Sequence, residues 1–344
     1  MTLKPLGNTG IQVPSIVFGT SALGNLFTAL DPKVKEELVK ESIKYTQPQT
    51  FFDSAGKYGA GLALESLGNA LNALNIPKDE VVVSNKLGWV RSPLLGPEPT
   101  FEKGVWRDLK HDAVQKISYD GILECFEEGN ELLQGYSTQL ASVHDPDEYL
   151  ANAKNEAEEA ALFEDILEAY RALEDLKKKG LVKGIGVGAK DWKVIPRIYE
   201  HIKLDWVMFA NSMTIISHPK DLMAFMQQLA DDGVGILNSA VFQSGFLVGG
   251  DYYDYKLIRP DTPENKQKFE WRDKFFAACK DFGVTPAHAC VQFGLSAPGV
   301  TSVALSTTEP DKVKRNVDST VNKLPDEFWA ELKNRGLLHE YSPV

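Results

Sequence analysis

The chain has 344 residues, 43% of them hydrophobic, and a formal net charge of −11 at pH 7. This charge argues against nucleic acid or an anionic membrane surface as a partner, because both would repel the protein. No stretch approaches the ~18 uninterrupted apolar residues of a membrane span, and the first residues lack the pattern of a signal peptide. We therefore expect a cytoplasmic protein that acts on small molecules.

The three cysteines, Cys125, Cys279 and Cys290, are far apart and lie within apolar helical patterns. We expect them to be small core residues in a reducing compartment. The histidines form no cluster with cysteines or carboxylates at metal-ligand spacing, so we expect no metal site.

The chain begins with a hairpin pattern, in which residues 3–6 and 11–13 flank the turn Asn8-Thr9-Gly10. Residues 15–18 form the first predicted strand of the main sheet. Asp31 followed by Pro32 predicts a helix start, and the helix continues to about Tyr45.

Strand and helix patterns then alternate along the rest of the chain. Further short apolar runs predict strands at residues 50–53, 81–85, 139–143, 182–187, 206–209, 235–238 and 301–305. Helical spacing predicts helices at residues 61–74, 118–134, 159–179, 193–201, 219–232 and 286–296. Repeated strand–helix alternation implies parallel strands. The length would allow two domains, but we predict a single (β/α)8 TIM barrel over residues 1–344, since such barrels reach this size with insertions.

Polar side chains stand at three consecutive strand ends, where barrel enzymes keep their active sites. Asp53 ends one strand and Tyr58 follows in a glycine-rich loop, Lys86 ends the next strand, and His144 the one after. Singly, each has an ordinary structural explanation: a helix cap, a core aromatic, a solvated lysine and a structural histidine. Together they indicate a catalytic group.

The chemistry of these four residues favours proton transfer coupled to hydride transfer. A tyrosine with a pKa of ~10 needs a nearby cation to stabilise its phenolate, and Lys86 is the candidate. A buried ammonium needs a carboxylate in turn, and Asp53 could supply it. The sequence offers no redox cysteine pair and no metal ligands to accept two electrons, so a nicotinamide cofactor is implied.

The run Gly184-Ile185-Gly186-Val187-Gly188 does not provide a dinucleotide-binding turn. Such a turn opens a helix near the start of a βαβ unit, whereas this run fits a strand with little side-chain bulk.

Two intervals exceed ordinary loop length, residues 88–118 and 249–264, and both are rich in aromatic residues. They follow predicted barrel strands, where lids and substrate walls belong, although idiosyncratic surface insertions remain the alternative. We expect Trp89 to stand beside Tyr58 and to offer an apolar face to a substrate. Trp192, after the fifth strand, is either a second substrate contact or a packing residue.

The order Asp53, Tyr58, Lys86 and His144 resembles the catalytic tetrad of the aldo-keto reductases. The segments Phe52-Asp53-Ser54-Ala55, Tyr58-Gly59, Ser84-Asn85-Lys86-Leu87-Gly88 and His144-Asp145-Pro146-Asp147 are similar to the branch with D-threo-aldose, L-galactose and pyridoxal dehydrogenases. The resemblance runs from the hairpin to about residue 321. It implies that the hairpin closes the bottom of the barrel and that Tyr58 is the general acid and base of catalysis. It also implies that His144 forms a hydrogen bond with the substrate oxygen.

The resemblance also implies a cofactor lying extended across the barrel mouth. By this resemblance, the nicotinamide carboxamide is bound near Gly188, Ala189 and Asn211, and Ser239 lies at the face of the nicotinamide ring. The pyrophosphate is bound by a loop that contains Ser244, Gly245 and Leu247. The remaining expected cofactor residues are Gly19, Thr20, Ser306, Thr307, Thr308, Lys312, Arg315 and Asn316. Ser306 stands where NADP-preferring members often have a lysine, which favours NAD, while Lys312 could still bind a 2′-phosphate. NAD and NADP both stay open.

Three functions follow. The first is oxidation of the anomeric carbon of a free aldose, such as L-fucose, L-galactose or D-arabinose, to its lactone. The second is aldehyde or ketone reduction, with pyridoxal oxidation beside it, and the third is a non-catalytic nucleotide-sensing subunit. The branch's common Arg-Tyr-Thr after the sixth strand is here Ser212-Met213-Thr214, which leaves the substrate open. The sequence does not distinguish a monomer from a dimer.

Overall fold

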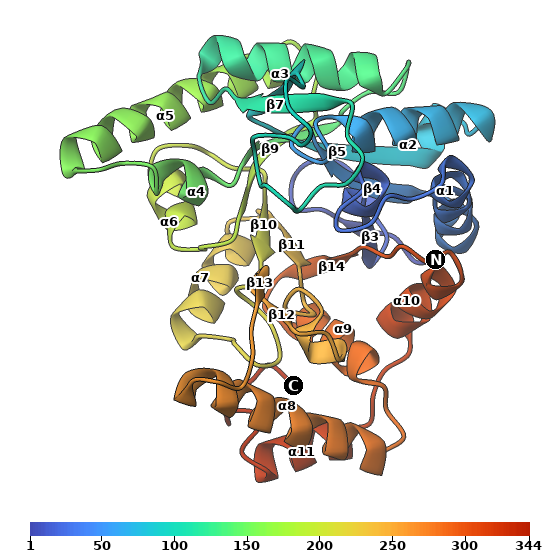
Figure 1. The fold of residues 1–344 in the computed structure, drawn as a ribbon. Coiled ribbons are helices and arrows are strands. Elements are labelled where there is room, and N and C mark those ends of the chain that lie inside the picture. The colour runs from blue at the N-terminus through green and yellow to red at the C-terminus, as the bar shows by residue number, and fades with distance from the viewer.

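A closed barrel of eight parallel strands forms the centre of the computed structural model, which describes residues 1–344 (Figure 1). Its strands, in order around the barrel, are β3 (Ile16–Gly19), β4 (Thr50–Ala55), β5 (Val81–Leu87), β8 (Leu140–His144), β9 (Gly184–Ala189), β10 (Trp206–Ala210), β11 (Gly235–Ser239) and β14 (Val300–Leu305). Pairing of β14 with β3 closes the ring. The predicted (β/α)8 barrel is confirmed.

Helices surround the barrel (Figure 1). They are α1 (Pro32–Thr46), α2 (Leu62–Ala73), α3 (Tyr119–Leu132), α4 (Pro146–Leu150), α5 (Glu156–Lys178), α6 (Val194–Tyr199), α7 (Lys220–Asp231), α8 (Pro263–Asp281), α9 (Pro286–Ser296), α10 (Asp311–Val321) and α11 (Asp326–Asn334). The sequence analysis did not predict α8 and α11, which pack together. In α8 the fully buried residues are Phe275, Ala278 and Cys279, so its apolar stripe is too short to stand out from its polar surface.

The bottom of the barrel is closed by the antiparallel hairpin of β1 (Lys4–Pro5) and β2 (Gln12–Val13). Leu6 and Val13 from the hairpin pack with Phe51, Trp206 and other apolar residues of the strands in one buried cluster. The glycine run is part of β9, as expected from its lack of bulk. A Cβ on Gly186 would lie 2.5 Å from the Trp206 ring, so only glycine leaves room for this large core side chain.

Both long intervals form small antiparallel hairpins at the other end of the barrel. The first contains β6 (Trp89–Pro93) paired with β7 (His111–Gln115), and the second contains β12 (Tyr252–Tyr253) paired with β13 (Lys256–Leu257). They follow β5 and β11 at their carboxyl ends, so they stand around the barrel mouth.

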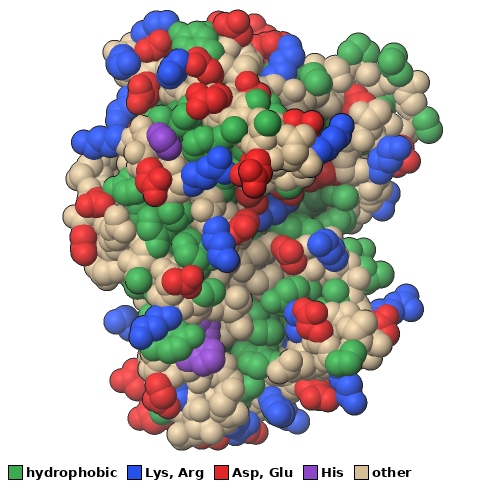
Figure 2. Space-filling model, turned by 90° about the vertical axis from the view of Figure 1, so that its left-hand side faces the viewer, with side chains coloured by type: hydrophobic (Ala, Val, Ile, Leu, Met, Phe, Trp, Pro, Cys, Tyr) green, Lys and Arg blue, Asp and Glu red, His purple; other side chains and the backbone are tan.

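The surface carries acidic and basic side chains interspersed with small apolar patches on the face drawn in Figure 2. None of the helices is both long enough and apolar enough to span a membrane.

Candidate active site

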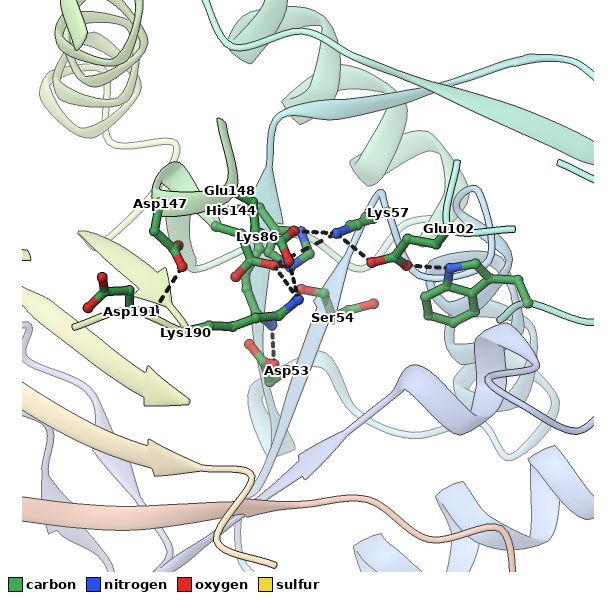
Figure 3. Close-up of polar contacts among 12 residues, drawn as sticks. Asp53, Ser54, Lys57, Lys86, Glu102, His144, Asp147, Glu148, Lys190 and Asp191 are labelled. Atoms are coloured by element: carbon green, nitrogen blue, oxygen red, sulfur yellow. Dashed lines mark hydrogen bonds and ion pairs between the residues drawn. The ribbon is translucent and has the colours of Figure 1, made fainter. Parts of the chain in front are cut away.

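The four residues predicted from the strand ends lie together at the mouth of the barrel, and Figure 3 shows three of them, Asp53, Lys86 and His144. The Lys86 ammonium is ion-paired with the Asp53 carboxylate, and both side chains are at most 5% exposed. Lys86 Nζ lies 4.8 Å from the centre of the Tyr58 ring. The imidazole of His144 meets the same ring edge-on at a centroid distance of 5.6 Å. The group therefore has the compactness that proton transfer requires.

Hydrogen bonds from neighbouring strands hold Asp53 in place. The Ser84 hydroxyl donates to Asp53 Oδ1 at 2.7 Å, which leaves Oδ2 for Lys86. The Thr20 hydroxyl donates to the Asp53 carbonyl at 3.0 Å. On the other side of Lys86, a Cβ on Gly188 would lie only 3.2 Å from the lysine Cδ. Thr20 and Gly188, both expected at the cofactor, thus also position the tetrad.

Tyr58 is a neutral phenol in this structure. Burial raises the pKa of Tyr58 well above its ordinary value, and the negative charge of Asp53 adds to the rise. Lys86, the expected cation beside the phenolate, is itself ion-paired with Asp53. A neutral phenol is suited to donating a proton.

His144 is a neutral imidazole for similar reasons. Burial lowers the pKa of His144 well below its ordinary value, and the charge of Lys86 lowers it further. Its Nδ1 is buried without a hydrogen-bond partner. A neutral imidazole has one N–H, which can donate a hydrogen bond to a substrate oxygen.

A second charged group adjoins the tetrad, and the sequence analysis did not identify it. We call it the mouth ion cluster: Lys57, Glu102, Asp145, Glu148 and Lys190 (Figure 3). Lys57 Nζ lies 2.7 Å from a Glu102 oxygen and 2.9 Å from a Glu148 oxygen. Lys190 pairs with Glu148 and lies 3.6 Å from Asp145. Two signals were available in the sequence, because Lys57 directly precedes Tyr58 and Asp145 directly follows His144.

Both lysines of the cluster are charged. Burial alone would lower the pKa of Lys57, but Glu102, Asp145 and Glu148 together raise it above its ordinary value. The pKa of Lys190 is likewise raised by Asp145 and Glu148 against the effect of burial. The cluster therefore contributes two cations and three carboxylates to the barrel mouth.

An aromatic wall stands on one side of Tyr58. Trp106 lies 5.9 Å from the Tyr58 ring, and its indole N–H donates to Glu102 at 2.7 Å. Phe101 joins Trp106 to Trp89, whose ring lies 5.5 Å from the Lys57 ammonium. Trp89, which was expected beside Tyr58, lies next to Lys57, while Trp106 is the tryptophan whose ring packs against Tyr58.

Trp192 has a different environment from Trp89. Its ring stacks on Phe225 of α7 at 6.2 Å and packs against the apolar core between helices and barrel. Of the two alternatives for Trp192, these contacts favour the packing role.

The residues expected to hold the nicotinamide carboxamide include unpaired acceptors. The Asn211 amide donates to Asp254 at 3.0 Å, while its Oδ1 is buried without a partner. Gln243, which the sequence analysis missed, donates to the Asn211 carbonyl and also has a buried Oε1 without a partner. Two buried acceptors without donors fit the NH₂ group of a carboxamide.

Two expected cofactor residues point away from the mouth. Side chains alternate along a strand, so Gly188 faces the barrel interior and Ala189 packs in the core outside it. Leu247 is also fully buried in that core. Backbone groups are therefore the parts of Ala189 and Leu247 that a ligand at the mouth could contact.

The remaining cofactor residues lie around the same end of the barrel. Ser239 donates to the Phe209 carbonyl at 3.1 Å, and the Ser244 hydroxyl accepts from the Tyr255 N–H at 2.8 Å. Gly245 has a φ of 96°, a conformation that favours glycine.

After β14, the Ser306 hydroxyl accepts from Ser21, whose loop follows Gly19 at the end of β3. Lys312 is ion-paired with Glu309 at the start of α10. The other expected residues of this segment are exposed or half-buried, namely Thr307, Thr308, Arg315 and Asn316.

The chain is similar to several characterised dehydrogenases over nearly its whole length. It is 26% identical over 343 residues to pyridoxal 4-dehydrogenase of Microbacterium luteolum, with 97% of each chain covered. It is 27% identical over 347 residues to D-threo-aldose 1-dehydrogenase of a Pseudomonas species, with 96% of each covered. L-galactose dehydrogenase of Arabidopsis thaliana is 23% identical over 316 residues, covering 92% of this chain and 86% of the relative.

Solved structures share the fold. An aldo-keto reductase of Bacillus halodurans, in its holo form, superimposes with a TM-score of 0.70 at 18% identity over 100% of both chains. A glycerol dehydrogenase of Gluconobacter oxydans also has a TM-score of 0.70, at 16% identity, over 99% of this chain and 96% of its own. The aldo/keto reductase family model matches residues 15–335. This chain therefore belongs to the aldo/keto reductase family and is an NAD(P)-dependent oxidoreductase.

Proposed function

We propose that this protein oxidises the anomeric carbon of a free aldose, of the L-fucose, L-galactose or D-arabinose type, to its lactone. The observation that carries this proposal is the mouth ion cluster beside the aromatic wall at Tyr58. Carboxylates and ammonium groups can hydrogen-bond sugar hydroxyls, and an aromatic face can cover the C–H side of a pyranose. The similarity to D-threo-aldose and L-galactose dehydrogenases supports the same substrate class.

The tetrad would supply the proton chemistry. In the oxidation, the C–H bond at the anomeric carbon breaks as a hydride and the hydroxyl gives up a proton. Tyr58, after loss of its own proton, accepts the proton of the hydroxyl, and the His144 N–H holds the oxygen in place. Lys86, held by Asp53, faces the Tyr58 ring and steadies the charge on its oxygen.

The nicotinamide cofactor, when bound, supplies the acceptor for the hydride. In the proposal Asn211 and Gln243 hold its carboxamide through their free oxygens. The backbone and hydroxyl groups of residues 244–247 then hold the pyrophosphate. The preference between cofactors rests on Ser306 and on Lys312, whose pairing with Glu309 leaves it less free for a 2′-phosphate. We propose a modest preference for NAD.

Reduction of an aldehyde or ketone is the second candidate. The neutral phenol of Tyr58 favours it, because reduction needs the protonated form to deliver a proton to the nascent alkoxide. Oxidation of pyridoxal is a further variant, supported by the similarity to pyridoxal 4-dehydrogenase.

A substrate screen with the purified enzyme tests these alternatives. Free aldoses and pyridoxal are offered with NAD and with NADP in parallel, and cofactor reduction is followed by absorbance. Aromatic aldehydes are offered with both reduced cofactors. We expect lactone formation from at least one of L-fucose, L-galactose and D-arabinose. An enzyme that reduces aromatic aldehydes efficiently but oxidises none of these sugars would overturn the aldose proposal and leave the reductase.

A further inference from the structure

Lys57 is a buried lysine whose charge is not used by the tetrad. Its side chain is 5% exposed although it directly precedes Tyr58. The ammonium contacts carboxylates from two other segments, Glu102 in the connection after β6 and Glu148 in helix α4 (Figure 3). A buried ammonium is costly unless it is paired, so these contacts tie the three segments together.

The contact with Glu102 continues back to the tetrad. The other Glu102 oxygen accepts the Trp106 indole N–H at 2.7 Å, and Trp106 packs against Tyr58 at 5.9 Å. Lys57, Glu102, Trp106 and Tyr58 thus form a closed ring of contacts. The ring fixes the distance between the aromatic wall and the proposed acid–base residue.

The segment that carries Glu102 is attached through a small apolar cluster, in which its Phe101 and Trp106 pack with Ala60 of the Tyr58 loop and Ala113 of β7. Residues 96–110 connect the two strands of the β6–β7 hairpin without a strand of their own, and many of their side chains are exposed. Backbone hydrogen bonds attach their far part to the loop after β3, including Phe27 N–H to the Val105 carbonyl at 2.9 Å. Lys57 is the charged group that attaches this segment to the Tyr58 loop.

We propose that Lys57 is a positioning residue that determines substrate specificity by holding residues 96–110 and Trp106 against Tyr58. The inference rests on the proposed function, since it assumes that the substrate lies between this wall and the tetrad. Without the ammonium, Glu102 loses its cation, while Glu148 keeps Lys190, so Glu102 is no longer drawn toward the Tyr58 loop. The segment then moves outward, and the substrate loses one wall of its site while the cofactor side is unaffected.

Three variants test the proposal. Lys57→Met keeps the length of the side chain without its charge, and Glu102→Gln keeps an acceptor for Trp106 but removes the ion pair. Lys103→Met is the matched control, because Lys103 lies next to Glu102 in the same segment, is exposed and has no ion pair. We expect the KM for the sugar to rise roughly 10- to 100-fold in the first two variants. In these two variants the KM for the cofactor should stay within about twofold of the wild-type value. In the control variant both KM values should stay within the same range.

The double variant Lys57→Met/Glu102→Gln adds a second criterion. If both residues act through one contact, the double variant should have a KM for the sugar close to that of Lys57→Met. Independent effects would instead multiply, so that the rise in KM would be the product of the two single rises. Unchanged sugar KM values in both folded single variants would overturn the proposal. Equal rises in the sugar and cofactor KM values would also overturn it, because they would indicate a general structural role.

Amide hydrogen exchange separates this inference from the proposed function. We expect faster exchange at residues 96–110 in Lys57→Met and Glu102→Gln, and wild-type exchange in Lys103→Met. A wild-type enzyme that oxidises no aldose would refute the proposed function, and the same variants would then be tested on whichever carbonyl it reduces. Unchanged exchange in both variants would overturn the positioning role. If Lys57→Met does not fold, Glu102→Gln alone decides, since the Glu102 side chain is 30% exposed.

Discussion

Replacing Asp53 by Asn should be far more damaging than the loss of one carboxylate usually is. The side chains of Asp53 and Lys86 are only 4% and 5% exposed. The Ser84 hydroxyl donates a hydrogen bond of 2.7 Å to the Asp53 oxygen that does not face Lys86. The amide keeps the shape and the bond to Ser84 but leaves Lys86 without a counter-charge. Removing one partner of a buried ion pair costs about 3–5 kcal/mol of unfolding free energy. We expect a loss of this size in Asp53→Asn.

A surface pair provides the matched control. Glu37 and Lys40 are 3.0 Å apart on α1, with side chains 44% and 52% exposed. Because water and salt screen such a pair, Glu37→Gln should lower the unfolding free energy by at most about 1 kcal/mol. The two variants make the same chemical change, so their difference isolates the effect of burial.

Urea unfolding at pH 7 measures both variants against the wild type, and turnover with the best substrate from the screen is measured in parallel. Asp53→Asn should also lose most of its turnover, because an unpaired Lys86 no longer faces Tyr58 in a defined position. A stability loss below about 1 kcal/mol together with wild-type turnover would refute the role given to this pair.

Three further changes give distinct outcomes. Tyr58→Phe removes only the proton carrier, so turnover should fall ~10²–10⁴-fold or more while cofactor binding, measured by fluorescence, persists. Wild-type turnover in this variant would end the assignment. Ser306→Lys should lower the KM for NADP, since a cation beside the 2′-phosphate adds a charge-assisted contact of ~1.5–3 kcal/mol before screening; no change would show that this segment does not reach the ribose. Burial raises the pKa of Asp147 from 3.8 to about 6, so the folded state holds this proton more tightly and stability is lost as pH rises from about 4 to 6. Asp147→Asn should therefore match the wild type near pH 4 and exceed it by up to about 3 kcal/mol at pH 7 in urea unfolding, and a constant difference across this range would contradict the shift.

The barrel and the tetrad were predictable because both depend on local patterns. Short apolar runs identify parallel strands, and the carboxyl ends of those strands converge whatever the intervening helices do. Asp53, Lys86 and His144 stand at such ends, so their meeting followed from their positions alone. Tyr58 follows β4 closely in the chain, so a short loop is enough to bring it beside these three residues.

The mouth ion cluster was not predictable in this way. Lys57 and Glu148 are 91 residues apart in the chain, and their contact depends on how separate loops fold over the barrel mouth. Similarly, the resemblance implied that Ala189 and Leu247 lie near the cofactor, but it did not give the direction of their side chains. For Ala189, that direction depends on strand alternation, where a shift by one residue exchanges inside for outside.

The charges around Tyr58 also bear on the direction of the reaction. Reduction uses the proton that the neutral phenol already carries, whereas oxidation requires Tyr58 to lose it first. Burial, Asp53 and Asp145 oppose that loss by raising the pKa of Tyr58, and Lys190 favours it by lowering the pKa. The charges of the mouth ion cluster thus act on the pKa of Tyr58 together with the charge of Asp53 in the tetrad.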